Sequence, residues 1–195
     1  MIQIILSADI DQDIDIIPDL MKIEKQVYEP EYCGEYESIR ARFLENKDTF
    51  VLAYDDTQMI GYLCFLPISE ELYYEFIYSD IFHDDDILPK DIMHYYNGVN
   101  LYLLSIAILP QYQNTDVIIQ MTNTFSKYLE KKAHNGIIIG NIVASAVTDD
   151  GEKFLQNLGF QVLKRVDSQF TLYHFNYCSN YNSDKQKFTE DKEVY

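Results

Sequence analysis

A nearly continuous apolar stretch occupies residues 101–109, and an amphipathic stretch follows it closely. The first is too continuously apolar for a half-exposed strand, so it predicts a central strand covered on both faces. Pro110 ends it, and a polar connection leads to Asp116. Beyond that point apolar side chains recur with the spacing of a helix, at Val117, Ile118, Met121, Phe125, Tyr128 and Leu129.

This strand, loop and helix form a candidate ligand-binding unit. The first amides of a helix lack intrahelical partners, so the start of the helix is suited to an anion. We expect Asn114 or Thr115 to be the N-cap residue, because both side chains can accept a hydrogen bond from a backbone amide.

The same reading of the pattern divides the rest of the chain into short elements. We expect strands at residues 1–7, 50–54, 59–66, 137–144, 161–164 and 169–175. We expect helices from Pro18 to about Tyr28, over residues 37–46, and from Thr148 or Asp149 to Leu158.

One connection is longer than this order of elements requires. Residues 68–99 are rich in tyrosine, phenylalanine and acidic side chains, which predicts a lid or a pair of helices on the substrate side. Residues 178–195 are polar and charged, and we expect a frayed tail there. The expected organisation is therefore a single domain over residues 1–177.

Length and composition agree with one soluble domain. The chain has 195 residues and is 47% hydrophobic, enough for a substantial core. It contains no apolar run of membrane-spanning length, and its first residues lack the features of a signal peptide, so we expect a cytoplasmic protein. Cys33, Cys64 and Cys178 are widely spaced and odd in number, which predicts reduced thiols.

The formal net charge of −17 argues against nucleic acid as a partner, since phosphates require clustered lysine and arginine. The charge is also unevenly distributed. Residues 1–99 contain 22 acidic and 6 basic residues, whereas residues 100–195 contain 10 and 9. If the acidic groups surround a cleft, they favour a cationic substrate such as an amine; the alternative is that they only confer solubility.

Two acidic clusters raise the question of a metal site. Asp9, Asp11, Asp13 and Asp15 alternate with other residues, but they lack the glycine and closing glutamate of a calcium loop. The run from His83 to Asp86 has metal-ligand residue types without a defined spacing. We expect no metal at either place.

The sequence around the central strand resembles the GNAT superfamily of acyl-CoA-dependent N-acyltransferases. Residues 106–113 read Ile-Ala-Ile-Leu-Pro-Gln-Tyr-Gln, similar to the fourth strand and following loop of that family. The Gly159-Phe160 pair resembles the end of its fourth helix, and Ile60-Gly61-Tyr62 resembles its preceding hairpin. The resemblance implies an α/β (α+β) fold with a mixed, mostly antiparallel central sheet, about four flanking helices, and a splay between the fourth and fifth strands.

The resemblance also implies acetyl-CoA as the cosubstrate. In the family, backbone groups of the fourth strand hold the pantetheine and thioester, which points to Ile106, Ala107 and Ile108. Amides of the following loop hold the pyrophosphate, which points to Gln113, Asn114, Thr115, Asp116, Val117 and Ile118. Here the family's two small residues are replaced by Asp116 and Ile118. The nearby cations Lys127, Lys131 and Lys132 have either a surface role or a phosphate contact.

The family's usual proton-transfer residues are absent. The position of its tyrosine acid holds Leu155, and the position of a frequent strand glutamate holds Val143. We take Tyr102 and Ser105 as the candidate catalytic residues, with Tyr173 and His174 as further candidates. For each, the alternative is a core side chain or a satisfied hydroxyl group.

Two classes of function follow from the resemblance. The first is transfer of an acetyl group from acetyl-CoA to a primary amine of a small molecule or of a protein, and we expect that amine substrate to be cationic. The second is a non-catalytic binding or interaction module of the same fold, in which the cofactor loop has degenerated.

Overall fold

The computed structural model describes residues 1–11, 13–79, 84–96, 98–166 and 170–178. Within these ranges the chain forms seven strands and five α-helices. The strands are β1 (Ile2–Leu6), β2 (Phe50–Asp55), β3 (Gln58–Ile68), β4 (Gly98–Ile108), β5 (Ile138–Ala146), β6 (Gln161–Val166) and β7 (Phe170–Asn176). The helices are α1 (Ile17–Val27), α2 (Tyr36–Glu45), α3 (Glu70–Tyr78), α4 (Val117–His134) and α5 (Asp149–Asn157).

The strands form one sheet with the order β1-β2-β3-β4-β5-β7-β6. Neighbouring strands are antiparallel except β4 and β5, which are parallel. The predicted α+β class and the mixed, mostly antiparallel sheet are therefore confirmed. Four helices match the predicted ones, and α3 lies in the inserted segment 68–99, of which residues 80–83 and 97 lie outside the described ranges.

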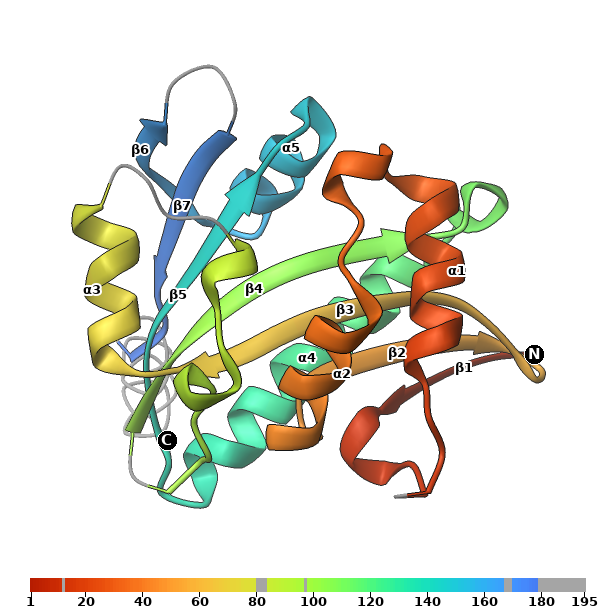
Figure 1. Cartoon of the computed structure of the whole chain (residues 1–195), viewed down its shortest axis with the longest axis horizontal. Helices are drawn as coiled ribbons and strands as arrows, with labels where there is room; N and C mark the ends of the chain where they lie inside the picture. The colour runs from red at the N-terminus through yellow and green to blue at the C-terminus, as the bar shows by residue number, and fades with distance from the viewer. Residues whose placement is uncertain (12, 80–83, 97, 167–169, 179–195) are drawn as a thin grey trace, which may run out of the picture.

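Helices cover both faces of the sheet (Figure 1). In this view α1 and α2 lie in front of the central strands, and α4 crosses behind them. Phe65 of β3 packs against Phe125 and Tyr128 of α4, with ring centroids 4.8 and 5.3 Å apart. Leu101 and Tyr102 of β4 are fully buried, which confirms β4 as a central strand covered on both faces.

The β2–β3 hairpin places β3 directly beside β4. Its turn is tight, and Asp56 adopts a left-handed conformation with φ of 51°. Gly61 on β3 lies opposite Ile108 on β4. A Cβ atom at Gly61 would be 2.9 Å from the carbonyl oxygen of Ala107, so glycine permits the close approach of the two strands.

The start of α4 differs from the prediction. Asp116, rather than Asn114 or Thr115, is the N-cap residue, and its side chain makes no capping hydrogen bond. The Thr115 hydroxyl donates to the carbonyl of Tyr112 at 2.6 Å and accepts the backbone N–H of Val117 at 3.4 Å, so it connects the preceding turn to the first residue of the helix. None of the helices in the described ranges has both the length and the apolar character needed to cross a membrane.

The strands β4 and β5 separate part of the way along their length. They pair from Gly98 opposite Ile138 to Leu103 opposite Ala144, and no pairing continues beyond that point in the described sheet. On its other side β4 stays paired with β3 up to Ile108, with an irregularity that skips Leu104. The predicted splay between the fourth and fifth strands is confirmed, and it leaves one edge of residues 104–108 open.

Candidate active site

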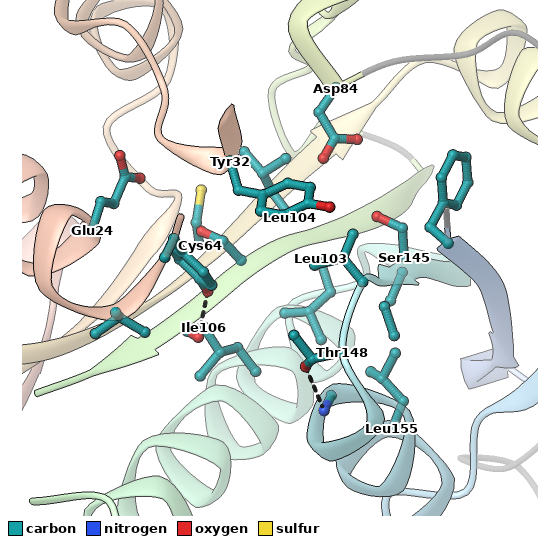
Figure 2. Close-up of a pocket in the computed structure, with 18 of the residues that line it drawn as sticks. Glu24, Tyr32, Cys64, Asp84, Leu103, Leu104, Ile106, Ser145, Thr148 and Leu155 are labelled. Carbon is teal, nitrogen blue, oxygen red and sulfur yellow. Dashed lines mark hydrogen bonds between the residues drawn. The ribbon is translucent and has the colours of Figure 1, made fainter. Parts of the chain in front are cut away.

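The separation of β4 and β5 opens a cleft of about 1050 Å³, at the upper end of the range for ligand pockets. Figure 2 shows Glu24 of α1 on one side of it, and Asp84 and Ser145 on the other. Leu104 and Ile106 of β4 lie between them. The cleft therefore lies along the open edge of β4, with a carboxylate on each side.

Tyr102 connects the two separating strands on one side of the cleft. Its hydroxyl donates its one proton to the Asp84 carboxylate, so it accepts the hydrogen bond from Oγ of Ser145 on β5, 2.7 Å away. Phe76 of α3 packs against its ring at a centroid distance of 4.5 Å. Burial, and then the negative charge of Asp84, raise the pKa of Tyr102 well above its ordinary value, so the hydroxyl keeps its proton.

Ser105 lies on the open part of β4 and begins a second chain of hydrogen bonds. Its hydroxyl donates to the hydroxyl of Tyr62 at 3.3 Å, and the Tyr62 hydroxyl donates to Oε1 of Glu24 at 2.8 Å. The other carboxylate oxygen of Glu24 accepts the backbone N–H of Gly34 at 3.1 Å. Three elements, β4, β3 and α1, thus contribute one side chain each to a connected polar chain.

Glu24 is buried, with only 8% of its surface exposed. Burial raises the pKa of its carboxyl group, while the hydrogen bonds from Tyr62 and Gly34 and the charge of Arg42 act in the opposite direction. Arg42 is itself buried and donates to the backbone carbonyl of Asp84 at 3.2 Å. One guanidinium group therefore stands close to both polar chains.

The strand residues expected to hold the donor differ in their surroundings. The carbonyl oxygen of Ile106 accepts the hydroxyl of Tyr28 at 2.7 Å, and that of Ile108 accepts the amide of Gln113 at 3.0 Å. A carbonyl oxygen has two lone pairs, so Ile106 can accept a further hydrogen bond from a ligand. Ile106 and Ile108 line the cleft, whereas Ala107 is buried outside it.

Only part of the predicted pyrophosphate loop reaches the cleft. Gln113, Asn114 and Ile118 line it, but Thr115, Asp116 and Val117 do not. The Asp116 carboxylate instead accepts a hydrogen bond from the side-chain amide of Gln120 at 2.8 Å. Its charge is thereby directed along the outside of α4.

The lysines of α4 lie far from this loop. Lys127, Lys131 and Lys132 follow Asp116 by 11 to 16 residues, or roughly 16–24 Å along a helix. Lys132 donates to Asp48 at 2.8 Å near the other end of α4. Of the two alternatives for these lysines, contact with a phosphate at the start of α4 is therefore disfavoured.

The remaining candidates lie outside the cleft lining. The Tyr173 hydroxyl accepts a hydrogen bond from Gln156 at 3.1 Å, and His174 lies 2.9 Å from the side-chain oxygen of Asn141. Leu155 does line the cleft and brings no ionisable group. In the described ranges no three His, Cys, Asp or Glu side chains gather in a metal-binding arrangement, and His83 lies outside those ranges.

The two hydrogen-bonded side-chain chains of the cleft include four residues that were not among the predicted site residues, namely Glu24, Tyr62, Asp84 and Ser145. One of them carried a signal in the sequence. Glu24 occupies the same helical stripe as the buried Leu20 and Ile23, where a charged residue is unusual. The other three become polar partners only when distant segments come together.

By sequence alone, no family model matches the chain, and no curated protein matches it either. Solved structures do match over about nine tenths of the chain. The loading GNATL domain of CurA from Lyngbya majuscula has a TM-score of 0.64 at 14% identity, covering 90% of this chain and 98% of that one. The PaiA N-acetyltransferase of Thermoplasma acidophilum, in complex with coenzyme A, has a TM-score of 0.58 at 15% identity, with 91% and 99% covered.

Naa50 of Arabidopsis thaliana, in complex with the bisubstrate analogue CoA-Ac-MVNAL, is similar at a TM-score of 0.59 and 10% identity, with 90% and 99% covered. Identities this low establish architecture and leave the reaction open. Together with the splayed parallel pair and the order of elements, they show that this chain has the GNAT fold.

Proposed function

We propose that the protein transfers an acetyl group from acetyl-CoA to a primary amine. The observation that carries this proposal is the end of β4–β5 pairing at Leu103 and Ala144, which opens a cleft through the sheet. The cleft runs from Asn114, before α4, to Glu24 on α1 at the other face. A donor and an acceptor can therefore meet at the open edge of β4 from opposite sides.

In this proposal the donor lies along β4 towards the start of α4. Ile106 and Ile108 border the pantetheine, with Ala107 contributing only backbone, and Gln113, Asn114 and Ile118 border the phosphate end. The cleft volume and the open strand edge fit a pantetheine thioester. The fit is poorer at the phosphates, which in this proposal lie near the start of α4. The basic residues in the described cleft lining are Arg42 on α2 and Lys164 on β6, and neither belongs to the loop before α4.

The acceptor amine approaches from the face covered by α1 and α2, where Tyr102 and Ser105 lie. Direct attack on the thioester needs the amine and the acyl group to be held together, which a cleft of this shape can supply. Tyr102 holds Ser145 by a hydrogen bond near the point where β4 and β5 separate. Ser105 provides a hydroxyl group two residues beyond Leu103, the last β4 residue that pairs with β5.

The test begins with binding and continues with turnover. Native mass spectrometry and calorimetry should detect coenzyme A bound to the purified protein, and a panel of primary amines should then give acetylated products. The rival function is a non-catalytic module, favoured by Leu155 and Val143 at the family's acid and base positions. Failure to bind either coenzyme A or acetyl-CoA at millimolar concentration would rule out the proposed acyl transfer.

A further inference from the structure

We propose that Ser105, Tyr62 and Glu24 form a proton relay that carries the proton of the attacking amine from the open edge of β4 to α1. This inference rests on the proposed acyl transfer and adds the route of the proton. It assigns a role to Glu24 and Tyr62, which lie on elements that the sequence resemblance does not connect with catalysis.

The hydrogen bonds run in one direction. The Ser105 hydroxyl donates to Tyr62 at 3.3 Å, and Tyr62 donates to Glu24 at 2.8 Å. Each hydroxyl group can pass its own proton onward as it accepts another, because it is both a donor and an acceptor. The chain ends on a carboxylate, the one member able to keep the proton.

Ser105 is placed at the reacting end. It lies two residues after Leu103, the last β4 residue that pairs with β5, and directly before Ile106, which lines the cleft. Ser105 is partly exposed, whereas Tyr62 and Glu24 are buried, with exposed fractions of only 1% and 8%. A proton can therefore enter at Ser105 and be held away from water at Glu24.

The step balances as follows. The amine nitrogen forms a bond to the thioester carbonyl carbon, and the carbon–sulfur bond breaks with its electron pair leaving on sulfur. The amine proton moves to Ser105, the Ser105 proton to Tyr62, and the Tyr62 proton to Glu24. The products are the amide, a thiolate and a neutral Glu24, so the overall charge is unchanged.

The surroundings of Glu24 suit a proton acceptor. The groups that face it are Tyr62 and Cys64 on β3, Tyr28 at the C-cap of α1, Cys33 in the following connection and Arg42 on α2. Burial raises the pKa of the Glu24 carboxyl, and Arg42 and the hydrogen bonds limit that rise. A carboxylate with a raised pKa is a stronger base than an exposed one near neutral pH.

The kinetic test uses three variants. Glu24→Gln removes the terminal acceptor and Tyr62→Phe interrupts the chain, while Glu35→Gln changes an exposed glutamate that makes no side-chain capping bond. We expect kcat/KM to fall about 100-fold or more in the first two and to stay within about twofold in the third. The loss in Glu24→Gln should shrink for an amine of low basicity, whose proton leaves without help.

A second readout needs neither donor nor turnover. Infrared titration of the free protein should show a buried carboxyl signal that Glu24→Gln removes. In Tyr62→Phe that signal should titrate at higher pH. The hydrogen bond from Tyr62 stabilises the ionised Glu24 carboxylate, so its loss raises the pKa of Glu24. A titration unchanged by Tyr62→Phe would show that the two groups are not coupled and would overturn the relay.

The outcomes separate the two proposals. If the parent protein acetylates amines and Glu24→Gln does so equally well at every pH, the relay is wrong and the acyl transfer stands. If the parent protein acetylates no amine, the proposed function fails and the relay with it. Calorimetry with coenzyme A should give similar affinities for all variants, which excludes a loss caused by misfolding.

Discussion

Glu24 is an ionisable residue on the buried, otherwise apolar face of α1. Its ionisation should make the free energy of unfolding depend on pH. Because burial raises the pKa of the folded carboxyl above its unfolded value, the folded state retains this proton over a pH window in which the unfolded state loses it. The contribution of Glu24 to stability is therefore full below the ordinary glutamate pKa and declines as pH rises through the raised value.

Glu24→Gln removes that dependence. We expect the unfolding temperature of the parent, relative to this variant, to be highest at acidic pH and to decrease as pH rises towards neutrality. Thermal unfolding of both proteins across this range measures the difference. A difference that does not vary with pH would mean that Glu24 has an ordinary pKa in the folded protein.

Asp116 is the residue at which resemblance and electrostatics conflict. Its carboxylate is bonded to Gln120 and lies outside the cleft lining, so removing its charge should change coenzyme A affinity less than threefold. Asp116→Gly should lower the free energy of unfolding by about 0.5–1 kcal/mol, through the lost charge at the helix start and the lost side chain.

Calorimetric titration of coenzyme A and denaturant unfolding measure the two effects. Asp116→Asn is the matched control, since it removes the charge and keeps a side chain that can bond Gln120. A gain in affinity of tenfold or more in either variant would place the carboxylate beside the phosphates, contrary to its position here.

Residues that line the cleft were predictable where they lie on β4, and much less so elsewhere. Tyr102 and Ser105 belong to a recognisable strand, so their place in the sheet follows from the pattern. Asp84 comes from the inserted segment and Ser145 from the end of β5. The contact of Ser145 with Tyr102 depends on how far two parallel strands remain paired, and that of Asp84 depends on how the inserted segment folds over β4; no local pattern of residues encodes either.

At the scale of elements, a polar and aromatic cluster joins the C-terminal end of α4 to neighbouring segments. Lys132 bonds Asp48 at 2.8 Å and lies 4.2 and 5.0 Å from the ring centroids of Tyr95 and Tyr128. The cluster joins α4 to the residues before β2 and to the inserted segment. Both charged side chains are largely buried, at 24% and 19% exposure.

Breaking this cluster should affect stability without altering the cleft. We expect Lys132→Ala to lower the free energy of unfolding by about 1–3 kcal/mol, because Asp48 and two tyrosine rings lose their partner. Lys131→Ala, at an exposed neighbouring position, should cost less than about 0.5 kcal/mol. Denaturant unfolding compares them, and equal effects would show that the cluster contributes nothing specific.

Element order was more predictable than element ends. Apolar runs and helical spacing locate the strands and helices because burial imposes both patterns over several residues. Thr148 was predicted as one of two possible helix starts, and it accepts the amide of Gly151 at 3.1 Å as the N-cap of α5. The predicted N-cap of α4 was wrong because Thr115 belongs to the turn before the helix, where its hydroxyl donates to the carbonyl of Tyr112 while it accepts the N–H of Val117, so the N-cap position falls on Asp116.

For the whole molecule, the excess of acidic residues lies in the half that supplies α1, α2 and the inserted segment. Those elements cover the face from which we propose that the amine enters. The described cleft lining includes Glu24, Glu31, Asp84 and Asp150 against Arg42 and Lys164. The charge asymmetry seen in the sequence thus reaches the cleft itself, and it should attract cations over a distance set by the salt concentration.

An amine that carries a second positive charge should therefore be preferred over a neutral analogue of the same length. We expect an alkyl diamine to have a KM several-fold lower than the matching amino alcohol at about 50 mM salt, with similar kcat, because both present the same primary amine to the donor. Raising the salt to about 0.5 M shortens the screening length well below 10 Å, so the two KM values should converge. Steady-state assays of the pair at both salt concentrations measure this. Equal KM values at low salt would show that the acidic face serves solubility alone, the alternative that the composition leaves open.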